Sequence, residues 1–91
     1  MKVQKTTLWR EVDDGLTAEL VFPDFSIAFQ FMTEVAEVAE RINHHPEWSN
    51  VYNRVSIRLT THDAGNRITD KDRELAAAIS NLPAIALLVD A

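Results

Sequence analysis

Residues 25–42 read FSIAFQFMTEVAEVAERI, the most strongly periodic stretch of the chain. The polar side chains form one narrow stripe at three- and four-residue spacing, made of Gln30, Thr33, Glu34, Glu37, Glu40 and Arg41. This spacing predicts an α-helix from about Phe25 to Ile42, with Asp24 or Ser26 as its N-cap. A helix with so wide an apolar surface is covered on more than one side. A small sheet can cover one side, so we expect a second subunit on the other, and hence self-association.

Two strand patterns precede this helix and one ambiguous region follows it. Residues 8–12 and 16–22 alternate apolar and polar side chains around Asp13-Asp14-Gly15. Because Asp and Gly tolerate the positive φ of a tight turn, this pattern predicts a β-hairpin. The region from Trp48 to Thr61 is either one long strand or a second hairpin turning at Asn53-Arg54. The pattern alone leaves both readings open.

A second helix is indicated near the C-terminal end. After a loop at residues 64–67, Thr69-Asp70-Lys71-Asp72 has the form of a capping box, in which a Thr and an acidic residue satisfy the helix N-terminus. The apolar face consists of Leu75, Ala76, Ala78, Ile79 and Leu82. We expect Pro83 to end this helix. The tail at residues 84–89 is too apolar to be left in water, so we expect it to pack on the body or on a neighbour.

Composition narrows the class of protein. Ninety-one residues with 46% hydrophobic and 25% charged side chains predict a single globular domain spanning residues 1–91. The net charge of −5 argues against nucleic-acid binding, which requires a basic face. The chain has no cysteine, which excludes disulfides, thiolate nucleophiles and sulfur-ligated metals. It shows no apolar run of signal-peptide or membrane-span length, so we expect a cytoplasmic protein without a membrane partner.

All three histidines lie within residues 44–62, in His44-His45-Pro46 and at His62. Imidazole both accepts and donates a proton near neutral pH, so this clustering points to proton-transfer chemistry. Two other interpretations stand beside it. The pair can be a helix exit, with imidazoles near a helix C-terminus where positive charge is favoured. Three histidines are also a known zinc-binding set, although adjacent side chains seldom converge on one ion.

The spacing of these residues resembles a known family. Glu40 precedes His44-His45-Pro46 by one helical turn, and Tyr52, His62 and Asp72 follow at fixed intervals. Together with the strings at residues 44–55, 61–65 and 69–72, this pattern is similar to that of the pterin-4a-carbinolamine dehydratases. The likeness runs from about Trp9 to about Leu82. It implies an α+β fold, a four-stranded antiparallel sheet with two main helices on one face in the order β-β-α-β-β-α. It therefore favours the second hairpin.

Three features depart from the family pattern. Family members commonly carry an extra N-terminal helix, which we expect this chain to lack. The loop after His62 is one residue longer than in many members, with Asn66-Arg67 where a single glycine is common, and this could alter the mouth of the pocket. The apolar tail beyond Pro83 has no counterpart in that pattern.

The resemblance implies a reaction. The family dehydrates 4a-hydroxytetrahydropterin to quinonoid dihydropterin in pterin recycling, after an aromatic amino acid hydroxylase has consumed its pterin. Loss of water requires a proton delivered to the C4a hydroxyl and one removed from N5, and each transfer is worth roughly 10²–10⁴-fold. The pterin is the substrate, and the resemblance calls for neither a metal nor an organic cofactor. We expect His45 and His62 to be the acid/base pair, with His44 orienting the pterin or sharing the proton transfer.

The resemblance also implies a wider site. The expected substrate contacts are Asn43, His44, His45, Thr60, Thr61, His62 and Asp63, supported by Glu40, Pro46, Trp48 and Asp72. Asp72 is interpreted chiefly as the helix cap, with a contact to the site besides. Glu40 is either a surface carboxylate or the group that holds an imidazole in one tautomer. Trp48 and Tyr52 are expected in the core or the pocket wall, and Trp9 in the core or an interface.

A non-enzymatic role is the competing hypothesis. Proteins that resemble this family can act as dimerisation partners or assembly factors, and the wide apolar helix would suit such a role. Relatives without the activity tend to lose histidines from the set, whereas this chain keeps all three. The sequence therefore favours the enzyme, as a homodimer or homotetramer.

Overall fold

The computed structural model of the protein describes residues 8–89. The elements follow in the order β1 (Arg10–Val12), β2 (Gly15–Val21), α1 (Phe25–Ile42), β3 (Glu47–Val51), β4 (Arg54–Leu59), η2 (His62–Ala64), α2 (Asp70–Ser80) and η3 (Pro83–Leu87), where η denotes a short 3₁₀ turn. The expected α+β class and the order β-β-α-β-β-α are confirmed. The expectation about an N-terminal family helix concerns a part of the chain outside the described residues.

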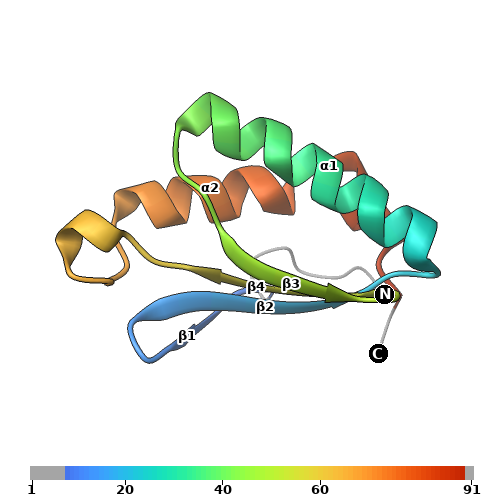
Figure 1. Ribbon diagram of the computed structural model, residues 1–91, viewed down its shortest axis with the longest axis horizontal. Coiled ribbons are helices and arrows are strands. Elements are labelled where there is room, and N and C mark those ends of the chain that lie inside the picture. Colours follow the sequence, from blue (N-terminus) through green and yellow to red (C-terminus); the bar gives the residue numbers. More distant parts are fainter. Residues whose placement is uncertain (1–7, 90–91) are drawn as a thin grey trace.

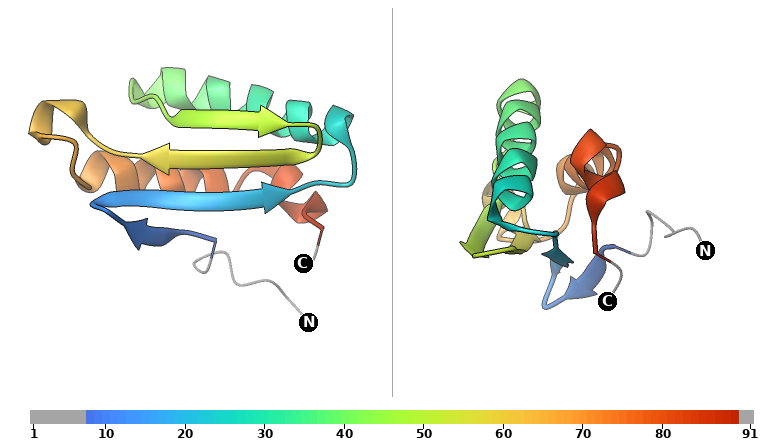
Figure 2. Two further views of the ribbon diagram at one scale, coloured as in Figure 1. Left: turned by 60° about the horizontal axis from the view of Figure 1, so that its bottom comes forward. Right: turned by 90° about the vertical axis from the view of Figure 1, so that its right-hand side faces the viewer.

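The four strands form one antiparallel sheet in the order β1-β2-β4-β3, and both main helices lie on the same face of it (Figures 1 and 2). Viewed end-on, α1 lies over the β3–β4 side and α2 over the β2 side (Figure 2, right). The register pairs Leu16 with Leu59, Ala18 with Ile57 and Leu20 with Val55, so every second side chain points towards the helices. These residues form the core together with Phe22, Ala28, Phe31, Val35, Val38, Leu75, Ala76, Ile79, Ala84 and Ile85.

The first hairpin follows the prediction. Asp13 (φ 50°) and Asp14 (φ 64°) are its two turn residues, and positive φ at both central positions suits the twist of the strands. The guanidinium of Arg58 reaches back across the sheet and donates to the carbonyls of Val12 (2.8 Å) and Asp13 (2.7 Å). This long-range contact holds the turn against β4.

The second hairpin is also present, which decides between the two readings of residues 48–61. The turn lies one residue earlier than expected, because Tyr52 takes the left-handed conformation (φ 50°) and Arg54 already begins β4. Asn53 ties the turn to the segment before α1, where its side chain donates to the Phe22 carbonyl at 2.9 Å. The prediction that Tyr52 lies in the core or the pocket wall is wrong, since a turn residue points outward and this side chain is 63% exposed.

Helix α1 has the predicted bounds. Asp24, and not Ser26, is the N-cap, because its carboxylate accepts from the Ile27 N–H at 2.9 Å. The helix ends at Asn43, whose left-handed conformation (φ 59°) closes the last turn. The buried face consists of Ala28, Phe31, Val35, Val38 and Ala39. Phe25 and Phe29 remain about half exposed and lie against each other, with ring centroids 5.8 Å apart.

Helix α2 begins with the predicted capping box and ends at Ser80, and Pro83 then begins η3. The tail packs on the body of this chain, which was one of the two expected outcomes, and buries Ala84 and Ile85. The carboxylate of Glu34 on α1 accepts from the Ala84 N–H at 3.1 Å. Trp9 is half-buried against the core and donates to the Ser80 hydroxyl at 2.9 Å. No helix within residues 8–89 is long and apolar enough to cross a bilayer.

Candidate active site

One pocket of about 320 Å³ brings together all seven residues that were expected to contact substrate. Its lining comes from the end of α1, the end of β4 with η2, and the first turn of α2, and comprises Asn43, His44, His45, Thr60, Thr61, His62, Asp63 and Lys71. Segments separated by about 30 residues in sequence therefore meet at one end of the helical layer.

Local backbone geometry explains how these segments meet. Asn43 ends α1 in the left-handed region, and the His44 N–H then donates to the Ala39 carbonyl at 3.0 Å. The chain thus leaves the helix in a set direction and presents both histidines beside the sheet. At the end of β4, an isolated bridge pairs Thr61 with Arg67 and turns the chain through η2, which carries His62.

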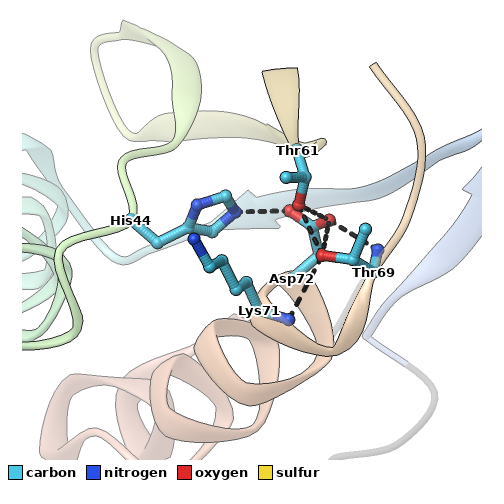
Figure 3. A network of polar contacts seen from close by, with 5 residues as sticks. All are labelled: His44, Thr61, Thr69, Lys71 and Asp72. Atoms are coloured by element: carbon cyan, nitrogen blue, oxygen red, sulfur yellow. Dashed lines mark hydrogen bonds and ion pairs between the residues drawn. The ribbon is translucent and has the colours of Figure 1, made fainter. Parts of the chain in front are cut away.

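Asp72 is the centre of a buried network (Figure 3). Its side chain is fully buried, and its carboxylate accepts from the Thr69 N–H at 2.8 Å and the Thr61 hydroxyl at 2.7 Å. The other carboxylate oxygen lies 2.6 Å from Nε2 of His44, whose side chain is 11% exposed. Asp72 is therefore both a helix cap and the partner of a pocket histidine, the two roles that the sequence suggested for it.

Opposing effects set the charge of Asp72. Burial raises the pKa of the Asp72 carboxyl, but hydrogen bonds from His44, Thr61 and Thr69, together with the nearby His44 charge, outweigh burial and hold the pKa below its ordinary value. The carboxylate is consequently ionised at neutral pH and can only accept hydrogen bonds. Nε2 of His44 therefore carries a hydrogen, which leaves Nδ1 as the nitrogen that can exchange a proton.

His45 has a different carboxylate partner. Its Nε2 lies 2.6 Å from Oε2 of Glu40, one helical turn back on α1. Glu40 thus contacts an imidazole, as one of its two interpretations proposed, and the imidazole is His45. Both side chains face solvent, with exposed fractions of 57% for His45 and 77% for Glu40. An exposed pair of this kind is screened by water and contributes little to stability, so its effect is mainly to orient the ring.

His62 is oriented from within its own loop. Its Nδ1 lies 3.3 Å from Oδ1 of Asn66, four residues later. An amide oxygen accepts and cannot donate, so Nδ1 carries the hydrogen in this contact. Within residues 8–89, Nε2 of His62 and the Nδ1 atoms of His44 and His45 make no hydrogen bond. Each imidazole in the pocket therefore has one nitrogen engaged and the other available.

Two expected supporting residues do not line the pocket, and one residue that does line it was missed. Pro46 and Trp48 do not line the pocket, and Trp48 packs against the core. Lys71 does line it, and its side chain extends towards the His44 ring (Figure 3). The capping-box pattern drew attention to Thr69 and Asp72 and assigned no role to Lys71. The sequence offers no signal for Lys71, because a place in a capping box does not show what lies opposite the helix N-terminus.

Other features of the molecule do not compete with this pocket for the proposed chemistry. A larger pocket of about 500 Å³ lies between the first hairpin and α2, and its lining is mostly apolar, with Trp9, Leu16 and Ala76. It contains no histidine, so it offers no comparable acid/base group. Within residues 8–89, no three His, Cys, Asp or Glu side chains are placed to hold a metal ion together.

Comparison with known proteins identifies a family and relatives of this chain. The family model described as pterin 4 alpha carbinolamine dehydratase matches residues 1–82. A protein of Rhodopseudomonas palustris (strain HaA2), named "Putative pterin-4-alpha-carbinolamine dehydratase", is 52% identical over 80 residues, covering 86% of this chain and 78% of that protein. A protein of the same name from Solibacter usitatus (strain Ellin6076) is 52% identical over 82 residues, covering 90% and 85%.

Two solved structures share the fold. A Brucella melitensis protein described as a transcriptional coactivator/pterin dehydratase superposes with a TM-score of 0.74 at 43% identity, covering 79% of this chain and 78% of that one. A pterin dehydratase-like protein identified as a RuBisCO assembly factor in the alpha-carboxysome superposes with a TM-score of 0.70, covering 85% and 90%. At 20% identity, the second structure shows a common fold alone. The family match over residues 1–82, with relatives at 52% identity over most of both chains, shows that the chain belongs to the pterin 4 alpha carbinolamine dehydratase family.

Proposed function

We propose that the protein dehydrates 4a-hydroxytetrahydropterin to quinonoid dihydropterin and water, in the recycling of pterins in the cytoplasm. The observation that carries this proposal is the arrangement of three imidazoles in one pocket, each with one nitrogen oriented by an acceptor and the other available. The reaction consists of two proton transfers and the breaking of one C–O bond, and imidazoles supply proton transfers near neutral pH.

The reaction balances with histidines alone. A protonated imidazole gives its hydrogen to the C4a hydroxyl, which leaves as water when the C4a–O bond breaks. A neutral imidazole takes the hydrogen from N5, and the N5 electron pair forms the C4a=N5 double bond. The acid has lost a proton and the base has gained one, so a proton exchange between them or with water restores the site. Loss of water does not change the oxidation level of the pterin, so no oxidant or reductant takes part.

We assign the acid/base pair to His44 and His62, which replaces His45 in the sequence-based expectation. His44 is supported by the buried carboxylate of Asp72, which orients the ring and stabilises the imidazolium that forms when Nδ1 takes a proton. Within residues 8–89, the carboxylate that contacts His45 is the exposed Glu40, so the proposed role of His45 is to orient the pterin. The second proton-transfer group is proposed to be His62, which lines the same pocket from η2.

The remaining lining residues are proposed to hold the bicyclic ring. A pocket of about 320 Å³ lies at the lower end of the range for small-molecule sites. Asn43, Thr60, Thr61 and Asp63 offer hydrogen-bonding side chains and backbone groups around it. The ammonium of Lys71 has no ion-pair partner within the described residues, so it is available to a carbonyl oxygen of the ring.

The test is the dehydration of freshly generated 4a-hydroxytetrahydropterin, followed by ultraviolet absorbance. The native chain should accelerate the reaction over its spontaneous rate, and His62→Ala should lose most of that acceleration while keeping its fold and association state. Equal activity in His62→Ala would remove the acid/base role of the histidine set.

An assembly or dimerisation role is the second candidate. The observation that favours it is the exposed aromatic pair Phe25 and Phe29 on α1, because exposed large apolar side chains in contact mark interaction surfaces. The solved relative described as a RuBisCO assembly factor shows that one protein with this fold has such a role. A native chain that binds no pterin and accelerates nothing would favour this alternative.

A further inference from the structure

The loop that follows β4 has a well-defined backbone. The Thr61 N–H donates to the Arg67 carbonyl at 2.8 Å, and the Thr61 carbonyl accepts from the Asn66 N–H at 3.0 Å. The Gly65 N–H donates to the His62 carbonyl at 3.0 Å. Gly65 (φ 82°) and Asn66 (φ 60°) both occupy the left-handed region, and Asn is one of the few residues other than Gly that adopts it readily. The position of Asn66 is therefore set by the loop.

This backbone directs the Asn66 side chain at a pocket histidine. Its Oδ1 lies 3.3 Å from Nδ1 of His62, and the amide oxygen accepts the hydrogen of that nitrogen. A glycine at this position would have no side chain with which to make this contact, so the contact depends on the Asn66 amide.

The result is a difference between the histidines of the pocket. Carboxylates hold His44 and His45 through Nε2, which makes Nδ1 the available nitrogen of both rings. Asn66 holds His62 through Nδ1, which makes Nε2 the available nitrogen. Nε2 lies farther from the backbone than Nδ1, so this tautomer places the proton-accepting atom of His62 at the outer end of its ring.

We propose that Asn66 is a positioning residue for His62, which holds the imidazole in the tautomer with hydrogen on Nδ1 and leaves Nε2 to act on the substrate. The tautomer itself is a property of the free protein. Only the effect on rate rests on the proposed dehydratase function.

The tautomer is measured by NMR on protein with ¹⁵N-labelled histidine, at a pH alkaline enough for the imidazoles to be neutral. In the native chain, His62 should show a protonated Nδ1 and an unprotonated Nε2. Asn66→Gly removes the contact but still allows the left-handed backbone, so His62 should move towards the Nε2–H form that free imidazole side chains prefer. Asn66→Asp retains an acceptor and should preserve the native tautomer.

Arg67→Ala is the matched control. It changes the next residue of the same loop, whose side chain is exposed and makes no hydrogen bond or ion pair within residues 8–89. Its His62 signals should match those of the native chain. A native His62 with hydrogen on Nε2, or an unchanged tautomer in Asn66→Gly, would overturn the proposal.

The rate measurement separates this proposal from the proposed function. Dehydration should fall about threefold to tenfold in Asn66→Gly, the equivalent of one ordinary hydrogen bond, and stay at the native level in Arg67→Ala. If the native chain accelerates no dehydration, the proposed function fails while the NMR result still decides the role of Asn66. If dehydration occurs but does not change in Asn66→Gly, the positioning role fails while the proposed function stands.

Discussion

Replacing Asp72 by Ala should destabilise the fold far more than replacing its neighbour Asp70 by Ala. Both acids lie in the first turn of α2, and both changes remove one negative charge there. Asp72 is fully buried and accepts hydrogen bonds from His44, Thr61 and Thr69, whereas Asp70 is exposed. The comparison therefore isolates the buried network from the general interaction of an acid with a helix N-terminus.

The loss of stability in Asp72→Ala can be estimated from the groups that lose the carboxylate as a hydrogen-bond partner. The Thr69 N–H loses a helix cap, worth about 1 kcal/mol. The hydrogen bond from His44 involves a charged acceptor and is worth about 1.5–3 kcal/mol. Thr61 loses little, because its hydroxyl still lies 2.6 Å from that of Thr69. Asp72→Ala should therefore cost about 3 kcal/mol, a large share of the roughly 5–15 kcal/mol that stabilise a typical domain.

Urea unfolding at neutral pH, followed by tryptophan fluorescence, measures this difference. With a slope of roughly 1.5 kcal/mol per molar urea, the midpoint of Asp72→Ala should lie about 2 M below that of the native chain. Asp70→Ala should stay within about 0.5–1 kcal/mol of the native chain, since it loses only the helix-dipole interaction. A free energy of unfolding for Asp72→Ala within about 0.5 kcal/mol of that for Asp70→Ala would refute the reasoning.

The same network predicts a pH dependence. The pKa of Asp72 is lower in the folded chain than in the unfolded chain, so between the two values the unfolded state binds more protons and stability rises with pH. The contribution of Asp72 to the stability of the fold is fully present above its unfolded pKa, about 4, and is lost as the pH falls through the folded pKa. The stability gap between native chain and Asp72→Ala should therefore be constant near neutrality and narrow in acid.

Three further changes test other parts of the structure. Glu40→Gln should lower stability by less than about 1 kcal/mol in urea unfolding, because its pair with His45 is exposed, and a larger loss would show that this pair is structural. Gly15→Ala places a Cβ 2.5 Å from the guanidinium carbon of Arg58, so it should displace that side chain from the hairpin turn. The fold should lose about 1–2 kcal/mol of stability in the same unfolding assay. Native stability of this variant would show that the turn does not need the contact. Phe29→Asp should keep native stability but weaken self-association in sedimentation, and unchanged association would place the interface elsewhere.

The parts of the fold that were predicted from sequence depend on local signals. The bounds of α1 follow from a period that extends over 18 residues and from an N-cap candidate directly before it. The choice between one strand and a hairpin at residues 48–61 required the resemblance, because alternation continues across the turn. The turn was placed one residue late since a tyrosine in the left-handed region gives no composition signal.

The resemblance named seven of the eight residues that line the pocket, but not how their side chains are arranged. His44 and Asp72 are 28 residues apart, and only the packing of α2 beside the end of α1 brings them within 2.6 Å. Which nitrogen of His44 carries the hydrogen depends on this tertiary contact. Lys71 was missed for the same reason, because its place in a capping box says nothing about what lies opposite the helix N-terminus.

The measurement that tests the central claim most directly is the acceleration of 4a-hydroxytetrahydropterin dehydration by the native chain and by its three single His→Ala variants, each checked for native folding. The account predicts that His44→Ala and His62→Ala each lose about 10²-fold or more, as expected when a general acid or base is removed, and that His45→Ala loses less. Full activity in His44→Ala or His62→Ala, or no acceleration by the native chain, would contradict it.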